Sequence, residues 1–170
     1  MHEQLMQLHS AISAVVSGSD AKDLARRPEG KWSASEILEH LNLSYAGTIK
    51  NLERRLAEDK PPISPRAPFS LPRFAVTRLG LFPRGRKSPE RVMPRGMPPR
   101  QVTAEILHNL VRMDDLISRC ESRFPARKAI ADHPILGPLT ASEWRGFHAT
   151  HGSHHIKQIE ALVKKPLLQH

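Results

Sequence analysis

The sequence predicts an all-α fold, a four-helix bundle within a single domain that spans residues 1–170. Four stretches repeat apolar residues every three or four positions, which is the spacing of one face of an α-helix. Two of these stretches begin with a capping box, a start signal of helices. No stretch alternates apolar and polar residues as a half-buried strand does. Long helices joined by non-repetitive loops are typical of a bundle, in which sites form between facing helices.

The first helix is predicted over residues 2–16. Leu5, Leu8 and Ile12 recur at helical spacing, and the breaker Ser17-Gly18-Ser19 ends the pattern. These apolar residues should therefore face the core.

The second long helix is predicted over residues 34–58, after a short helical turn within residues 20–27. Ser33 and Glu36 form a capping box, in which each side chain accepts a hydrogen bond from an otherwise unpaired backbone N–H. Pro61 follows the last periodic residues and cannot continue a helix.

The connection over residues 60–100 carries the excess charge of the chain. It holds ten lysines and arginines against one acid, Glu90, which accounts for the formal net charge of +9, and it has ten of the 15 prolines. So many prolines exclude a long helix, although residues 69–82 are apolar enough to pack on the protein. We expect a long, partly ordered connection between the second and third long helices, of the kind that forms lids or binding loops.

The third and fourth long helices are predicted over residues 101–123 and from Thr140 to about Lys164. Thr140 and Glu143 form the second capping box. The core positions of the third helix repeat at helical spacing and are Val102, Ile106, Leu110, Met113 and Ile117.

The cysteine content and the N-terminus predict a cytoplasmic protein. Cys120 is the only cysteine, so an intramolecular disulfide or a cysteine-rich metal site is excluded. The first sixteen residues mix polar and apolar side chains, unlike a signal peptide, and no run is long and apolar enough to span a membrane.

Four of the ten histidines lie within residues 148–155, inside the fourth predicted helix. At about 100° per residue, His148, His151 and His155 fall within roughly 60° of one another, in a sector that also contains Trp144. These histidines should therefore face the interior.

The spacing of the histidines favours a metal site. His151 and His155 are four residues apart, the spacing at which one helix presents two imidazoles to one ion. His40, on the inward face of the second long helix, is the best third ligand, whereas His108 lies off the apolar stripe of its helix. The alternative is that each histidine packs in the core with a hydrogen-bond partner of its own.

Three segments resemble the DinB/YfiT-like superfamily. They are residues 32–41 (WSASEILEHL), residues 133–144 (HPILGPLTASEW) and residues 151–159 (HGSHHIKQI). The resemblance implies a four-helix bundle that binds a divalent metal, nickel or zinc, through His40, His151 and His155. It also implies supporting roles for His154 and for Gln158, which resembles a recurrent glutamine of the family; otherwise Gln158 makes a contact between helices.

The resemblance implies a metal-dependent hydrolase, or a transferase or isomerase that uses a low-molecular-weight thiol, acting on a small-molecule substrate. No carboxylate is an obvious general base, because Glu36 caps its helix and Glu39 points about 100° away from His40. His148 is a candidate proton shuttle, although simple packing explains it as well.

Two further functions stay open. The basic segment could dock on nucleic acid or on an acidic partner, with the bundle as a scaffold, but its few aromatic residues disfavour base stacking. Alternatively, the protein is a purely structural bundle that forms a homodimer without metal.

Overall fold

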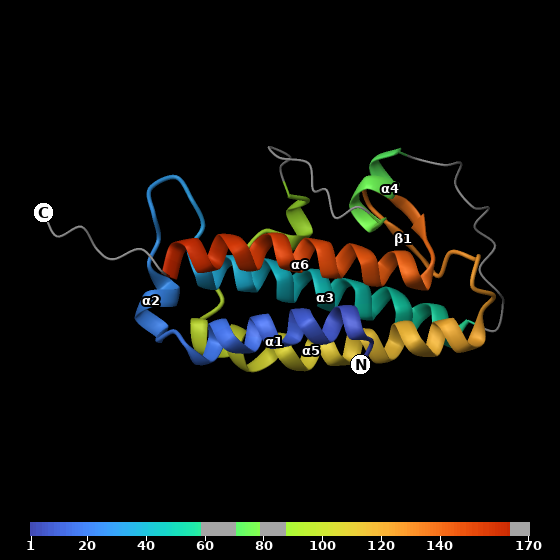
Figure 1. Ribbon diagram of the computed structural model, residues 1–170, viewed down its shortest axis with the longest axis horizontal. Helices are drawn as coiled ribbons and strands as arrows, with labels where there is room; N and C mark the ends of the chain where they lie inside the picture. Colours follow the sequence, from blue (N-terminus) through green and yellow to red (C-terminus); the bar gives the residue numbers. More distant parts are fainter. Residues whose placement is uncertain (59–70, 79–87, 164–170) are drawn as a thin grey trace, which may run out of the picture.

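The computed structural model describes residues 1–58, 71–78 and 88–163. The described chain is mostly helical, as predicted. Four long helices run along the long axis of the molecule (Figure 1) and are α1 (Glu3–Ser17), α3 (Ala34–Ala57), α5 (Pro99–Arg123) and α6 (Ala141–Val163). Shorter elements join them and are α2 (Ala21–Ala25), α4 (Leu71–Arg78), the 3-10 helix η1 (Glu90–Val92) and strands β1 (Ala131–His133) and β2 (Gly137–Leu139).

Both predicted capping boxes are confirmed. At the start of α3, the Ser33 hydroxyl accepts from the Glu36 backbone N–H at 3.2 Å, and the Glu36 carboxylate accepts from the Ser33 N–H at 2.8 Å. Thr140 and Glu143 exchange the same two bonds before α6, at 3.3 and 2.9 Å. These bonds satisfy backbone donors that the first turn of a helix leaves unpaired, so both helices begin where the sequence predicts.

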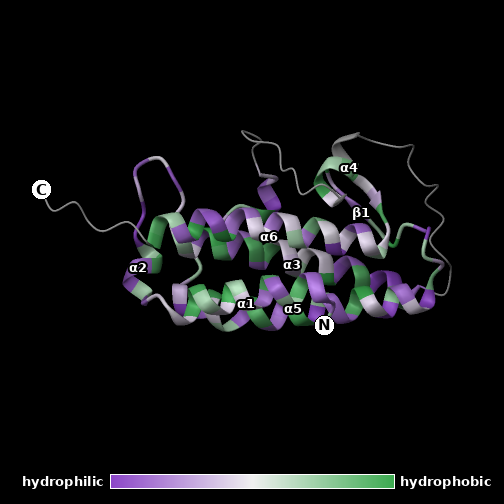
Figure 2. Ribbon diagram, viewed as in Figure 1, coloured by the Kyte–Doolittle hydropathy of each residue, from purple (hydrophilic) through white to green (hydrophobic). Residues whose placement is uncertain are grey.

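The core lies between the four long helices, each of which carries hydrophobic and hydrophilic stripes (Figure 2). The predicted core positions of α1 and α5 are confirmed, because all of them are at most 2% exposed. They are joined by apolar residues of α3 and α6, chiefly Leu38, Leu41, Leu52, Trp144 and Ile159.

A two-stranded antiparallel hairpin precedes α6, although no alternation of apolar and polar residues marks it in the sequence. Ala131 pairs with Leu139 and His133 with Gly137, where Gly137 has a φ of +73°. Each strand has only three residues, too few for an alternating pattern to show in the sequence. The indole N–H of Trp144 donates to the Ala131 carbonyl at 3.2 Å, which fixes the hairpin on α6.

Two glycines of α6 allow close packing against its neighbours. A Cβ on Gly146 would lie 2.3 Å from the Thr77 carbonyl oxygen of α4, and a Cβ on Gly152 would lie 2.5 Å from both methyl carbons of Leu8 in α1. Because Gly152 follows His151 directly, the contact with α1 also fixes the rotation of the helix that carries the histidines.

The predicted connection over residues 60–100 is described only in part. Residues 59–70 and 79–87 lie outside the described chain, and so do five of the ten basic residues of the connection. The rest of the connection contains α4 and η1, both short, as the prolines require. No helix in the described ranges is long and apolar enough to cross a membrane.

Candidate metal centre

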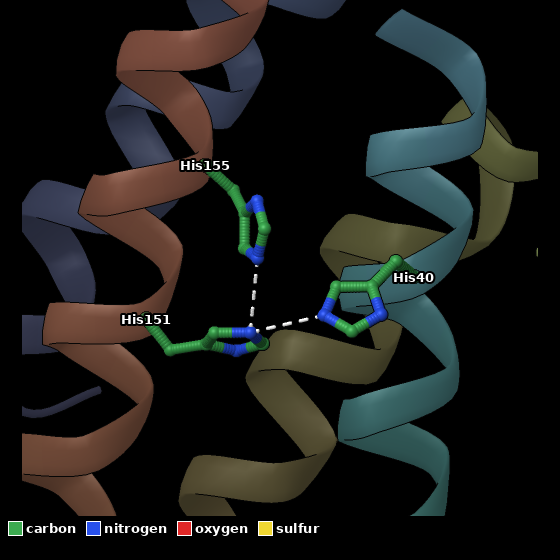
Figure 3. A group of neighbouring side chains, drawn as sticks. All are labelled: His40, His151 and His155. Carbon is green, nitrogen blue, oxygen red and sulfur yellow. Dashed lines mark hydrogen bonds between the residues drawn. The ribbon is translucent and has the colours of Figure 1, made fainter. Parts of the chain in front are cut away.

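The structure brings His40, His151 and His155 together between α3 and α6, with their Nε2 atoms pointing to one place (Figure 3). The Nε2 atom of His151 lies 3.0 Å from that of His40 and 3.1 Å from that of His155. All three side chains are buried, at 3%, 5% and 8% exposure in chain order. His148 is 0% exposed, so the prediction that His148, His151 and His155 face the interior is confirmed.

The outer nitrogens of His40 and His155, the Nδ1 atoms that face away from the group, have fixed partners, whereas the inner nitrogens are the three Nε2 atoms. The Nδ1–H of His40 donates to the Val92 carbonyl at 2.8 Å, because a carbonyl can only accept. The Nδ1–H of His155 donates to the Gln158 side-chain oxygen at 2.8 Å, and the Gln158 amide nitrogen donates in turn to His154 at 3.1 Å. In their neutral forms, His40 and His155 therefore carry a lone pair on Nε2, where a metal would bind.

The inner nitrogens fit a cation. The lone pairs of His40 and His155 both face the Nε2 of His151, and one proton on that atom can serve only one of them well. A tetrahedral ion with metal–nitrogen bonds of about 2.0–2.1 Å places its ligands about 3.3 Å apart. The two distances from the His151 nitrogen are close to this value, and all three nitrogens lie within 4.8 Å of one another. The donor set is thus suited to a small divalent metal.

Burial keeps these histidines in the form that binds metals. It lowers the pKa of His155 to about 4, helped by the charge of His40, and it holds the pKa of His151 well below its ordinary value, helped by the charges of His155 and His40. Burial also lowers the pKa of His40, an effect that the hydrogen bond to Val92 partly offsets. At neutral pH all three imidazoles are uncharged, as ligation requires.

The walls of the site are aromatic. The ring of Trp32 lies 5.3 Å from that of His40, and the ring of Phe147 stacks on His151 at 5.2 Å. Such walls restrict water around the imidazoles and lower the local dielectric, which strengthens electrostatic interactions in the site.

His148, the candidate proton shuttle, lies one turn before His151 and outside the group of three. Its Nε2 lies 3.0 Å from the Thr48 hydroxyl, which itself donates to the Ser44 carbonyl, so the imidazole is the donor. Burial, with the charge of His133, lowers the pKa of His148 to about 3. The shuttle role stays a prediction, and this burial works against it because protonation near neutral pH is costly.

Three residues near the site, Val92, Glu39 and His133, were not predicted from the sequence. The Val92 carbonyl orients His40, but a backbone group leaves no trace in the residue type, and Val92 lies in a segment predicted only as a connection. Glu39 is 1% exposed, and its place among the apolar Ile37, Leu38 and Leu41 could have indicated that it is buried. His133 supports the hairpin, since its Nδ1 accepts from the backbone N–H groups of Ile135 and Leu136.

A family model described as "Protein of unknown function (DUF1569)" matches residues 3–162, which include every helix of the site. Comparison with curated proteins and with solved structures found no match.

Proposed function

The chain belongs to the DUF1569 family, whose description assigns no activity, and we propose that it is a metal-dependent enzyme in which His40, His151 and His155 hold one divalent ion. The observation that carries the proposal is the convergence of three buried Nε2 atoms from two helices. A finer fold assignment, a four-helix bundle of the DinB/YfiT-like type, belongs to the same proposal and is supported by the four long helices around the histidines.

Nickel or zinc is the proposed metal, because imidazole ligands suit both ions. When bound by three protein ligands, either ion supplies a Lewis acid with an open position and lowers the pKa of water or of a thiol there. Three neutral imidazoles add no negative charge to the site. The site therefore favours an anionic nucleophile, and the proposed reactions are hydrolysis of a small molecule or transfer or isomerisation with a low-molecular-weight thiol.

The protein's own groups orient the ligands and exclude water. Val92 and Gln158 hold the outer nitrogens of His40 and His155, so that their inner nitrogens stay unprotonated. Trp32 and Phe147 flank the imidazoles and limit the access of solvent.

The alternative, a scaffold whose basic segment binds nucleic acid or an acidic partner, rests on ten lysines and arginines, five of which lie outside the described chain. No observation on the described residues favours it. That the protein is cytoplasmic, or that it forms a homodimer, stays a prediction.

Metal analysis of protein purified without chelators tests the proposal. We expect about one divalent ion per chain, which is lost in His40→Ala and in His155→Ala. His108→Ala is the matched control, because it removes an exposed histidine of α5 and should leave the metal in place. Metal that persists at one per chain in both ligand variants would contradict the assignment. Screens with hydrolase substrates and with thiol cosubstrates would then separate the two chemistries.

A further inference from the structure

The carboxylate of Glu39 holds a loop against α3 beside the candidate metal centre. Glu39 is 1% exposed and accepts three backbone hydrogen bonds, from Arg95 at 2.7 Å, from Gly96 at 3.1 Å and from Met97 at 3.0 Å. A buried carboxylate needs such partners, because burial removes its water. We call residues 90–98, which carry these three N–H groups, the strap.

The same strap carries the hydrogen-bond acceptor of a candidate ligand. Val92 lies three residues before Arg95, and its carbonyl accepts from the Nδ1–H of His40 at 2.8 Å. The strap is therefore attached to two consecutive residues of α3, to Glu39 through its N–H groups and to His40 through a carbonyl. Only Met93 and Pro94 separate the two attachments, and the proline ring restricts the backbone between them.

The hydrogen bonds of Glu39 exclude its use as a general base in this arrangement. Its Oε1 accepts from Arg95, and its Oε2 accepts from both Gly96 and Met97. Both oxygens are thus committed to backbone donors, and their charge is spread over three N–H groups. The carboxylate instead determines where the strap lies.

We propose that Glu39 is a positioning residue that acts through the strap on His40, placing the Val92 carbonyl so that the imidazole keeps its proton on Nδ1 and presents a bare Nε2. The inference rests on the proposed function for its consequence, since a bare Nε2 matters to metal binding. Its structural part, control of the His40 tautomer, holds with or without a metal.

The Glu39→Gln variant is the direct test. A glutamine has nearly the same shape, but its amide group must face either the Arg95 N–H or the pair of N–H groups of Gly96 and Met97. The side-chain N–H groups of the glutamine then face a backbone N–H of the strap, and because both are donors the strap moves away on that side. Glu53→Gln is the matched control, because it removes one acid from the exposed face of the same helix, where Glu53 pairs with Arg112.

Two measurements on each folded variant decide the outcome. In nitrogen-15 NMR spectra of metal-free protein at pH 8, we expect His40 of the wild type and of Glu53→Gln to carry its proton on Nδ1. In Glu39→Gln that tautomer should lose population to the Nε2–H form. Affinity for zinc or nickel should fall about 10–100-fold in Glu39→Gln, the usual effect of losing a group that orients a ligand.

An unchanged His40 tautomer together with a metal affinity within twofold of the wild type would overturn the inference. Failure of the proposed function looks different: the wild type binds no metal, while the tautomer still changes between wild type and Glu39→Gln. If Glu39→Gln does not fold, Gly96→Ala disturbs the strap from its other side. Gly96 has a φ of +86°, which alanine adopts only with strain, and no heavy atom lies within 4 Å of its added Cβ. The same tautomer shift and loss of affinity are expected there, and an unchanged His40 would again overturn the inference.

Discussion

Alanine in place of Gly146 tests how α4 packs on α6. The added Cβ would lie 2.3 Å from the carbonyl oxygen of Thr77 and 3.2 Å from its carbonyl carbon. These are backbone atoms, so no side-chain rotation relieves the clash and α4 must shift as a unit. Overpacking of this kind costs about 1–3 kcal/mol, whereas replacing glycine by alanine within a helix gains about 1 kcal/mol. We therefore expect the free energy of unfolding to fall by up to about 2 kcal/mol.

Gly47→Ala is the matched control for this substitution. Gly47 lies on the exposed side of α3, and a Cβ there meets no heavy atom within 4 Å. Only the gain in helix propensity applies, so we expect the free energy of unfolding to rise by up to about 1 kcal/mol. Both variants add the same methyl group, and the difference between them isolates the clash with α4 at about 1–3 kcal/mol.

Urea denaturation followed by far-ultraviolet circular dichroism measures both variants. In a chain of this length, a change of 1 kcal/mol also shifts the melting temperature by about 2–4 °C, so thermal unfolding provides a second reading. A Gly146→Ala variant as stable as Gly47→Ala would show that α4 does not approach the backbone of α6 at this point.

Three further predictions concern the cap of α3, the buried ion pair and the buried histidine. Ser33→Ala removes the acceptor of the Glu36 N–H and should lower the free energy of unfolding by about 1 kcal/mol; an unchanged urea midpoint would contradict this cap. Arg145 is buried and pairs with two carboxylates, the buried Asp114 at 3.1 Å and the exposed Glu121 at 2.6 Å. Asp114→Ala removes the buried partner and should lower the free energy of unfolding by about 3 kcal/mol in urea denaturation. A loss well below about 1 kcal/mol would mean that the remaining partners of Arg145 suffice. Because the pKa of His148 falls from 6.5 in the unfolded chain to about 3 in the fold, the unfolded chain binds the extra proton between these values. The free energy of unfolding of metal-free protein should then drop as pH falls below 6.5, by about 1.4 kcal/mol per pH unit from this group. Urea denaturation at pH 7, 6 and 5 measures this dependence, and the free energy of unfolding should change less with pH in His148→Gln than in the wild type. An equal pH dependence in the two proteins would refute this role of His148.

The sequence was enough to predict the long helices and the inward histidines, because both depend on local spacing. Leu5, Leu8 and Ile12 repeat at the period of a helix, and all three are buried as that period requires. His151 and His155 share one helical face for the same reason. The capping serine and threonine mark the starts of α3 and α6 through bonds that span only three residues.

The hairpin and the strap could not be predicted, because each depends on contacts between distant parts of the chain. The three-residue strands are held by Trp144, which lies on the following helix. Glu39 binds N–H groups that lie 56 to 58 residues later, and no local rule gives that distance. An isolated acid in an apolar helical run indicates that a buried partner exists, but it does not say which segment supplies it.

The three histidines also work against the stability of the metal-free protein, which is a reason to read them as functional. Imidazoles must be stripped of water to lie between α3 and α6, and their lowered pKa values show that this burial is costly for the charged form. Leucine or isoleucine would fill the same helix faces without polar atoms to satisfy. A sequence that served the fold alone would therefore not place three imidazole nitrogens against one another. It would also not orient two of these imidazoles through hydrogen bonds from their Nδ1 atoms to Val92 and Gln158. Such local conflict with stability is expected where a protein keeps a binding site.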